Sequence, residues 1–77
     1  MHQSYKLVLK IDSEIHRTTY HFNYNQVRRY IRSDYLRDEC GLNPADLQAK
    51  VYFRSALADV FGGQNEELIY EGKALGY

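Results

Sequence analysis

Few side chains in this sequence could do covalent or metal chemistry, and their placement argues against both. Cys40 is the only cysteine in the 77 residues, and it follows Asp38 and Glu39 near the end of a predicted helix. A reactive cysteine needs its thiolate stabilised by a cation or a helix N-terminus, and negative neighbours have the opposite effect. His16 and His21 point to opposite faces of a predicted strand, so they do not converge on one metal ion. We therefore expect a protein that is not an enzyme and binds no metal or cofactor.

Basic side chains are the second chemically useful group, because several cations on one surface can bind phosphates. The net charge is zero, yet residues 1–33 carry six cations and two anions (+4), and residues 34–77 carry four cations and eight anions (−4). The basic candidates of the N-terminal half are Lys6, Lys10, Arg17, Arg28, Arg29 and Arg32. They support nucleic-acid binding as an alternative function.

The first element that positions these cations is a strand predicted over residues 4–11, where apolar and polar side chains alternate. Leu7 and Leu9 point to one face of this strand, and Lys6 and Lys10 point to the other. We expect the leucines to be buried and the lysines to be exposed, as on the two faces of an antiparallel sheet.

Residues 15–24 are predicted to form the second strand of a hairpin. Its aromatic residues share one face, which we expect to pack against a helix: Tyr20, Phe22 and Tyr24. Arg17 and His21 would then join the lysines on the exposed face. A loop of even length, Asp12–Ser13 or Asp12–Ile15, allows this pairing without a bulge. Rings and cations would thus lie on opposite faces, which weakens the case for binding a single-stranded nucleic acid.

A long helix is predicted from Asn23 to Gly41, because Asn caps helix starts well and Gly often ends helices. Its apolar residues fall on two stripes, one with Val27, Ile31 and Tyr35 and one with Leu36 and Cys40. A surface helix needs only one apolar stripe. The second stripe would pack on another helix or on a partner, and a homodimer is one such arrangement.

The rest of the chain is predicted to add a helix over residues 45–61 and a strand over residues 67–71. The resulting order, ββααβ, indicates one α+β domain over residues 1–77, with a flexible tail at residues 72–77. Residues 49–54 also alternate as a strand would.

With that strand the order becomes ββαβ(α)β, which resembles the β-grasp fold of ubiquitin in element order and length. The resemblance is topological only. The tail reads Ala74-Leu75-Gly76-Tyr77 and lacks the diglycine of a conjugated modifier, so it gives conjugation no support.

The favoured function is a small protein-binding module, a regulator or inhibitor of a larger partner, for which a phage or mobile-element origin is conceivable. It rests on eight tyrosines, a residue type enriched at interfaces, and on the lack of catalytic groups. The predicted contact residues are Tyr30, Asp34, Leu36, Asp38 and Glu39. No stretch is apolar enough to span a membrane, and one cysteine forms no internal disulfide, so we expect a cytoplasmic protein.

Overall fold

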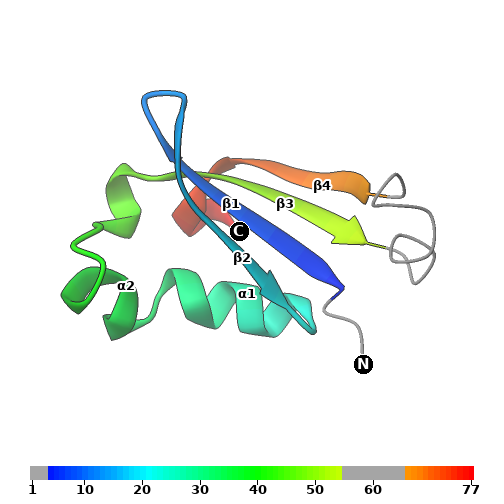
Figure 1. The fold of residues 1–77 in the computed structure, drawn as a ribbon, viewed down its shortest axis with the longest axis horizontal. Helices are drawn as coiled ribbons and strands as arrows, with labels where there is room; N and C mark the ends of the chain where they lie inside the picture. Colours follow the sequence, from blue (N-terminus) through cyan, green and yellow to red (C-terminus); the bar gives the residue numbers. More distant parts are fainter. Residues whose placement is uncertain (1–3, 55–65) are drawn as a thin grey trace.

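The computed structural model describes residues 4–54 and 66–77, in which one face of a four-stranded antiparallel sheet is covered by helices (Figure 1). The element order is β1 (Tyr5–Ile11), β2 (Glu14–His21), α1 (Tyr24–Ile31), α2 (Asp34–Asp38), η1 (Pro44–Asp46), β3 (Gln48–Arg54), β4 (Glu66–Lys73) and η3 (Ala74–Gly76), where η marks a 3₁₀ helix. The strands lie in the order β2-β1-β3-β4. The α+β class predicted from the sequence is confirmed, and the observed order ββααββ roughly matches the predicted ββααβ layout, with one further strand.

The turn between β1 and β2 is the two-residue loop Asp12–Ser13, one of the two even loops predicted. Both residues have left-handed backbones, with φ of 49° and 71°. Positive φ at both central positions characterises type I′ turns, whose twist suits the flanking strands of a hairpin. A two-residue loop by itself would give the strand faces predicted above.

A bulge just beyond this turn reverses those faces. Lys10 pairs with Ile15, whereas Leu9 pairs with Arg17, so His16 is the additional residue in β2. From Arg17 onward the side chains of β2 therefore point to the faces opposite to those predicted. Tyr20 lies on the uncovered face with Lys6, and Arg17 and His21 lie on the helix side.

The helix side can accept a basic residue because polar atoms cover this edge of the sheet. The Tyr30 hydroxyl accepts a hydrogen bond from Nε of Arg17, and the Tyr35 hydroxyl accepts one from its Nη2 at 3.1 Å. The prediction that Tyr20, Phe22 and Tyr24 pack under a helix is wrong, since all three are exposed.

The predicted helix from Asn23 to Gly41 is divided into two. Asn23 does cap α1, since its side chain accepts a hydrogen bond from the Gln26 amide at 3.0 Å. The Ser33 hydroxyl accepts one from the Leu36 amide at 3.4 Å and so caps a second helix, α2. This break turns the second apolar stripe back toward the sheet, so that stripe packs inside the domain rather than on a partner.

The region after α2 also departs from the predicted layout. Residues 45–54 are not helical beyond the short turn η1, and β3 confirms the alternative strand at residues 49–54. The remainder of the predicted second helix lies outside the described residues. The last six residues are packed rather than loose, because Ala74 is buried and its amide donates to the Leu47 carbonyl oxygen at 2.9 Å.

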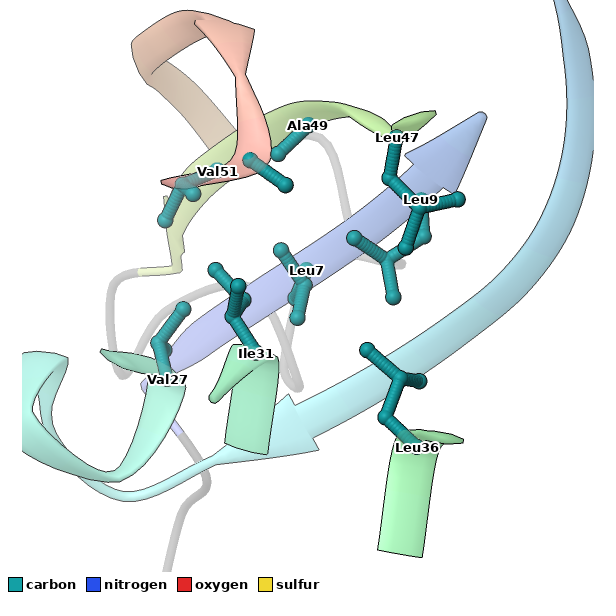
Figure 2. Packing of buried hydrophobic residues seen from close by; sticks show 9 residues of the cluster. Leu7, Leu9, Val27, Ile31, Leu36, Leu47, Ala49 and Val51 are labelled. Atoms are coloured by element: carbon teal, nitrogen blue, oxygen red, sulfur yellow. The ribbon is translucent and has the colours of Figure 1, made fainter. Parts of the chain in front are cut away.

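The hydrophobic core lies between the sheet and the helices (Figure 2). It is formed by Leu7, Leu9, Val27, Ile31, Leu36, Leu47, Ala49, Val51 and Ala74. The predicted inward direction of Leu7 and Leu9 is confirmed. This cluster lies on one face of the sheet; the opposite face, where Val8 is also buried, has no helix over it within the described residues.

Candidate functional site

The uncovered face of the sheet contains a shallow hollow of about 500 Å³. Its lining comes from three strands and consists of Lys6, Val8, Lys10, Ile15, Thr18, Tyr20, Lys50 and Tyr52. We call these eight residues the open face. They include three lysines, two tyrosines and no carboxylate, so the hollow carries a charge of +3.

Lys6 lies at the centre of one row of the open face, directly between the two tyrosines. It pairs with Tyr20 on β2 and with Tyr52 on β3. The Lys6 ammonium is 5.0 Å from the centroid of the Tyr52 ring, and the Arg54 guanidinium is 5.2 Å from the centroid of the Tyr20 ring. Both rings are thus in contact with a cation, within the range of cation–π attraction.

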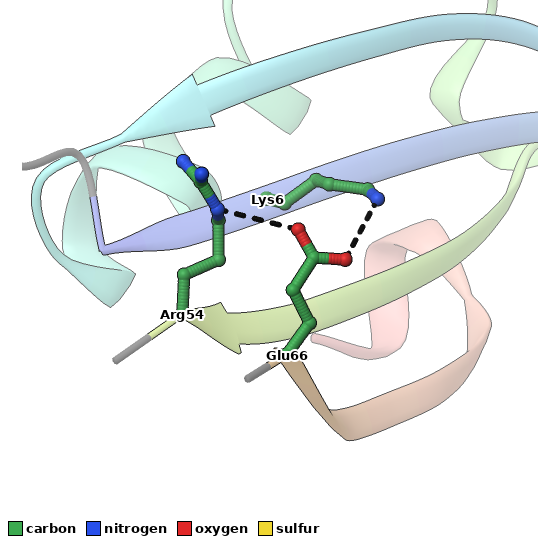
Figure 3. A network of polar contacts seen from close by, with 3 residues as sticks. All are labelled: Lys6, Arg54 and Glu66. Atoms are coloured by element: carbon green, nitrogen blue, oxygen red, sulfur yellow. Dashed lines mark hydrogen bonds and ion pairs between the residues drawn. The ribbon is translucent and has the colours of Figure 1, made fainter. Parts of the chain in front are cut away.

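Two carboxylates at the margin of the open face pair with its cations. Glu66 bridges Lys6, at 3.0 Å to Nζ, and Arg54, at 3.2 Å to Nε (Figure 3). Lys50 is 3.3 Å from Glu71. Lys10 forms no ion pair with any residue in the described ranges. The open face therefore combines a lysine available to a ligand with cations that are already engaged.

The structure brings together side chains that the sequence analysis had separated. Lys6 and Lys10 are on the uncovered face, as predicted, but Arg17 is not with them. Lys50, Tyr20 and Tyr52 were missed as members of this surface. A bulge in β2 and the strand state of residues 48–54 placed them there.

Arg17 belongs instead to a polar cluster on the helix side, at the edge strand β2. Its hydrogen bond to the Tyr30 hydroxyl raises the pKa of Arg17 above its usual value. Burial raises the pKa of Tyr30. Tyr30 also lies 5.2 Å, centroid to centroid, from the ring of His21. Arg17 therefore orders this edge of the domain and is not available to the open face.

His21 makes the stability of this edge sensitive to pH, because partial burial lowers the pKa of its imidazole. A lowered pKa means that the unfolded chain binds the proton more readily. We therefore expect the free energy of unfolding to fall as the pH drops below about 6.5. Urea denaturation between about pH 5 and 7 measures this. His21→Gln should flatten the profile in that interval, and His16→Gln, at an exposed site, should leave it as in the native sequence.

A second basic surface lies on the helix layer, where a hollow of about 610 Å³ is lined by Arg28, Arg29, Arg32 and Tyr77. Arg28 Nε donates to the Tyr77 carbonyl oxygen at 2.9 Å, and Arg32 Nη2 donates to the Leu75 carbonyl oxygen at 2.9 Å. Two of the three arginines thus hold the last turn of the described chain against α1. The contacts of these two arginines are therefore accounted for by a structural role, and no ligand is needed to explain them.

The residues predicted to bind a protein do not form one surface. Leu36 is fully buried in the core, so its assignment to an interface is wrong. Tyr30 is half-buried and hydrogen-bonded to Arg17. Asp34, Asp38 and Glu39 are exposed, and Asp34 lies 3.9 Å from Arg37. Cys40 is partly buried and packs beside the core.

The described residues contain neither a metal-ligand cluster nor a membrane-spanning helix. No three His, Cys, Asp or Glu side chains gather in an arrangement that could hold a metal ion within residues 4–54 and 66–77. Over the same ranges, no helix has the length and apolar character needed to cross a membrane. Comparisons with protein-family models, with curated proteins and with solved structures each returned no match to this chain.

Proposed function

We propose that the open face binds single-stranded nucleic acid and that the protein works by binding rather than by catalysis. One observation carries the proposal: Tyr20 and Tyr52 flank Lys6 on an uncovered sheet, inside a hollow that holds three lysines and no carboxylate. Bases that stack on aromatic rings, with cations alongside to track the phosphates, are the usual means of binding single strands.

The arrangement favours a single strand over a duplex. Stacking on a protein ring needs an exposed base face, and paired bases inside a duplex do not offer one. Each stacked base contributes about 1–3 kcal/mol, while the cations contribute a term that depends on salt. A duplex would gain only the second contribution from this surface.

Fluorescence anisotropy of labelled oligonucleotides tests the proposal. We expect a mixed-sequence single strand to bind more tightly than a duplex of the same sequence. If three lysines engage phosphates, the logarithm of the association constant should fall with the logarithm of salt at a slope of about −2. The absence of binding to a single strand at low salt, or equal affinity for the duplex, would refute the proposal.

A protein-binding module, acting as a regulator or inhibitor, is the second candidate. It is favoured by apolar side chains at the margin of the same face, where Ile15 is 66% exposed and Leu68 is 44% exposed. The lysines would then pair with an acidic partner surface. If single strands fail to bind at low salt, and a partner captured by the native protein is lost with Ile15→Glu, this candidate is preferred.

We assign either function to the cytoplasm. The support for this location is the lone cysteine, which is free and half-buried beside the core. Disulfides are rare in reducing compartments, and this chain uses none.

A further inference from the structure

We propose that Glu66 occupies the position of a nucleotide phosphate on the open face and that a bound strand must displace it. The inference rests on the proposed function, since it describes how the same site is regulated. Glu66 would act as an internal competitor that lowers the affinity of the free protein for its ligand.

The geometry around Glu66 is that of a two-cation anion site. One carboxylate oxygen, Oε1, is 3.0 Å from Lys6 Nζ, and the other, Oε2, is 3.2 Å from Arg54 Nε (Figure 3). A phosphodiester also presents two unesterified oxygens that share one negative charge. It could therefore bridge the same pair of cations that the carboxylate bridges.

The two cations that pair with Glu66 also lie over the two tyrosine rings of the open face. Lys6 lies over the ring of Tyr52, and Arg54 lies over the ring of Tyr20. In this arrangement each ring has a cation 5.0 Å or 5.2 Å from its centroid, within the range of cation–π attraction. A base that is to stack on either ring must displace that cation, so Glu66 controls the rings as well as the phosphate position.

The shielding of the three side chains makes the competition effective. The exposed fractions of the side chains are 24% for Lys6, 21% for Arg54 and 23% for Glu66. Ion pairs at exposed sites are weak because water and salt screen them, whereas partly buried pairs are screened less. Binding would therefore exchange one well-placed anion for another, and the apparent affinity equals the intrinsic affinity multiplied by the fraction of molecules in which Glu66 has moved away.

Glu66→Gln removes the competing charge and is expected to tighten single-strand binding about fivefold, as measured by anisotropy at constant salt. Glu67→Gln is the matched control, because it makes the same charge change one residue along. Glu67 is exposed and pairs with Phe53, which points to the opposite face of the sheet from Tyr52 and Arg54. Its substitution should change the affinity less than about twofold.

Glu66→Asp separates the bridging geometry from the net charge. Aspartate keeps the charge but is one methylene shorter, so it does not reach both cations from the same backbone position. We expect tighter binding than in the native protein and weaker binding than with Glu66→Gln. Thermal unfolding of each variant verifies that the sheet has formed.

The outcomes distinguish this inference from the function on which it rests. Binding by the native protein with equal affinity for Glu66→Gln and Glu67→Gln overturns the competitor role alone. Weaker binding by Glu66→Gln overturns it too, because Glu66 would then assist the ligand. No binding by the native protein or any of the three variants overturns the proposed function itself.

Discussion

Reversing two charges of the open face, with Lys10→Glu and Lys50→Glu together, is expected to weaken single-strand binding at least about a hundredfold at low salt. The two substitutions change the charge of the hollow from +3 to −1, and each removes a cation that could neutralise a phosphate. Within the described ranges Lys10 has no ion-pair partner, and the ion pair of Lys50 is with Glu71, whose side chain is 59% exposed. Anisotropy titrations measure the loss of affinity, and circular dichroism measures the fold.

The control for this double variant makes the same charge change on the helix layer, with Arg29→Glu and Arg37→Glu. Both arginines are exposed, and Arg29 lines the second basic hollow. We expect these changes to lower the affinity less than about tenfold, through the general field of the protein. If the helix-layer variant loses binding and the open-face variant keeps it, the ligand binds around α1 and our assignment of the site is wrong.

Truncating the core residue Leu36 to alanine is expected to lower the free energy of unfolding by about 2–5 kcal/mol. Leu36 is fully buried between α2 and the sheet. Domains of this size are stable by only about 5–15 kcal/mol, so the loss should be visible as a large shift of the urea midpoint.

Leu75→Ala is the matched control for Leu36→Ala, because the same atoms are removed from a side chain that is 42% exposed. It should cost less than about 1 kcal/mol. The pair also tests the earlier idea that Leu36 lies in an interface. A variant that keeps its stability but changes its oligomeric state would contradict burial of Leu36 in the core.

The parts of the fold that follow from local patterns could be predicted from the sequence. Alternation along residues 5–11 placed Leu7 and Leu9 inward and Lys6 and Lys10 outward, and the structure agrees. The cap at Asn23 and the two-residue turn were also among the expected features. Each depends on residues close together in the chain, so a single sequence contains the information needed.

Interactions between residues far apart in the chain explain why the faces of β2 were not predicted correctly from the sequence. Because of the bulge at His16, the aromatic face of β2 is left exposed. In return, Arg17 donates hydrogen bonds to Tyr30 and Tyr35, which are distant in sequence. The alternation of apolar and polar residues, taken alone, predicts that the aromatic face of β2 is buried. Because a bulge reverses every later side chain, this one feature moved Tyr20 into the candidate site and Arg17 out of it.

A competing cap at Ser33 had a similar effect on the helices. A serine in the middle of a helical pattern can turn its hydroxyl to a backbone amide and begin a new helix. The helical wheel assumes one continuous axis, so it placed Leu36 opposite Val27 and Ile31. Because the helix is broken at Ser33, that assumption does not hold, and Leu36, Val27 and Ile31 lie in one core (Figure 2).

The central position of β1 has a consequence for how the chain folds. One neighbour, β2, follows it across a two-residue turn, while the other, β3, comes only after both helices. The first pairing closes a short loop and the second closes a long one, which costs more chain entropy. The hairpin should therefore assemble early in folding, and docking of β3 beside β1 should limit the rate at which the native sheet forms.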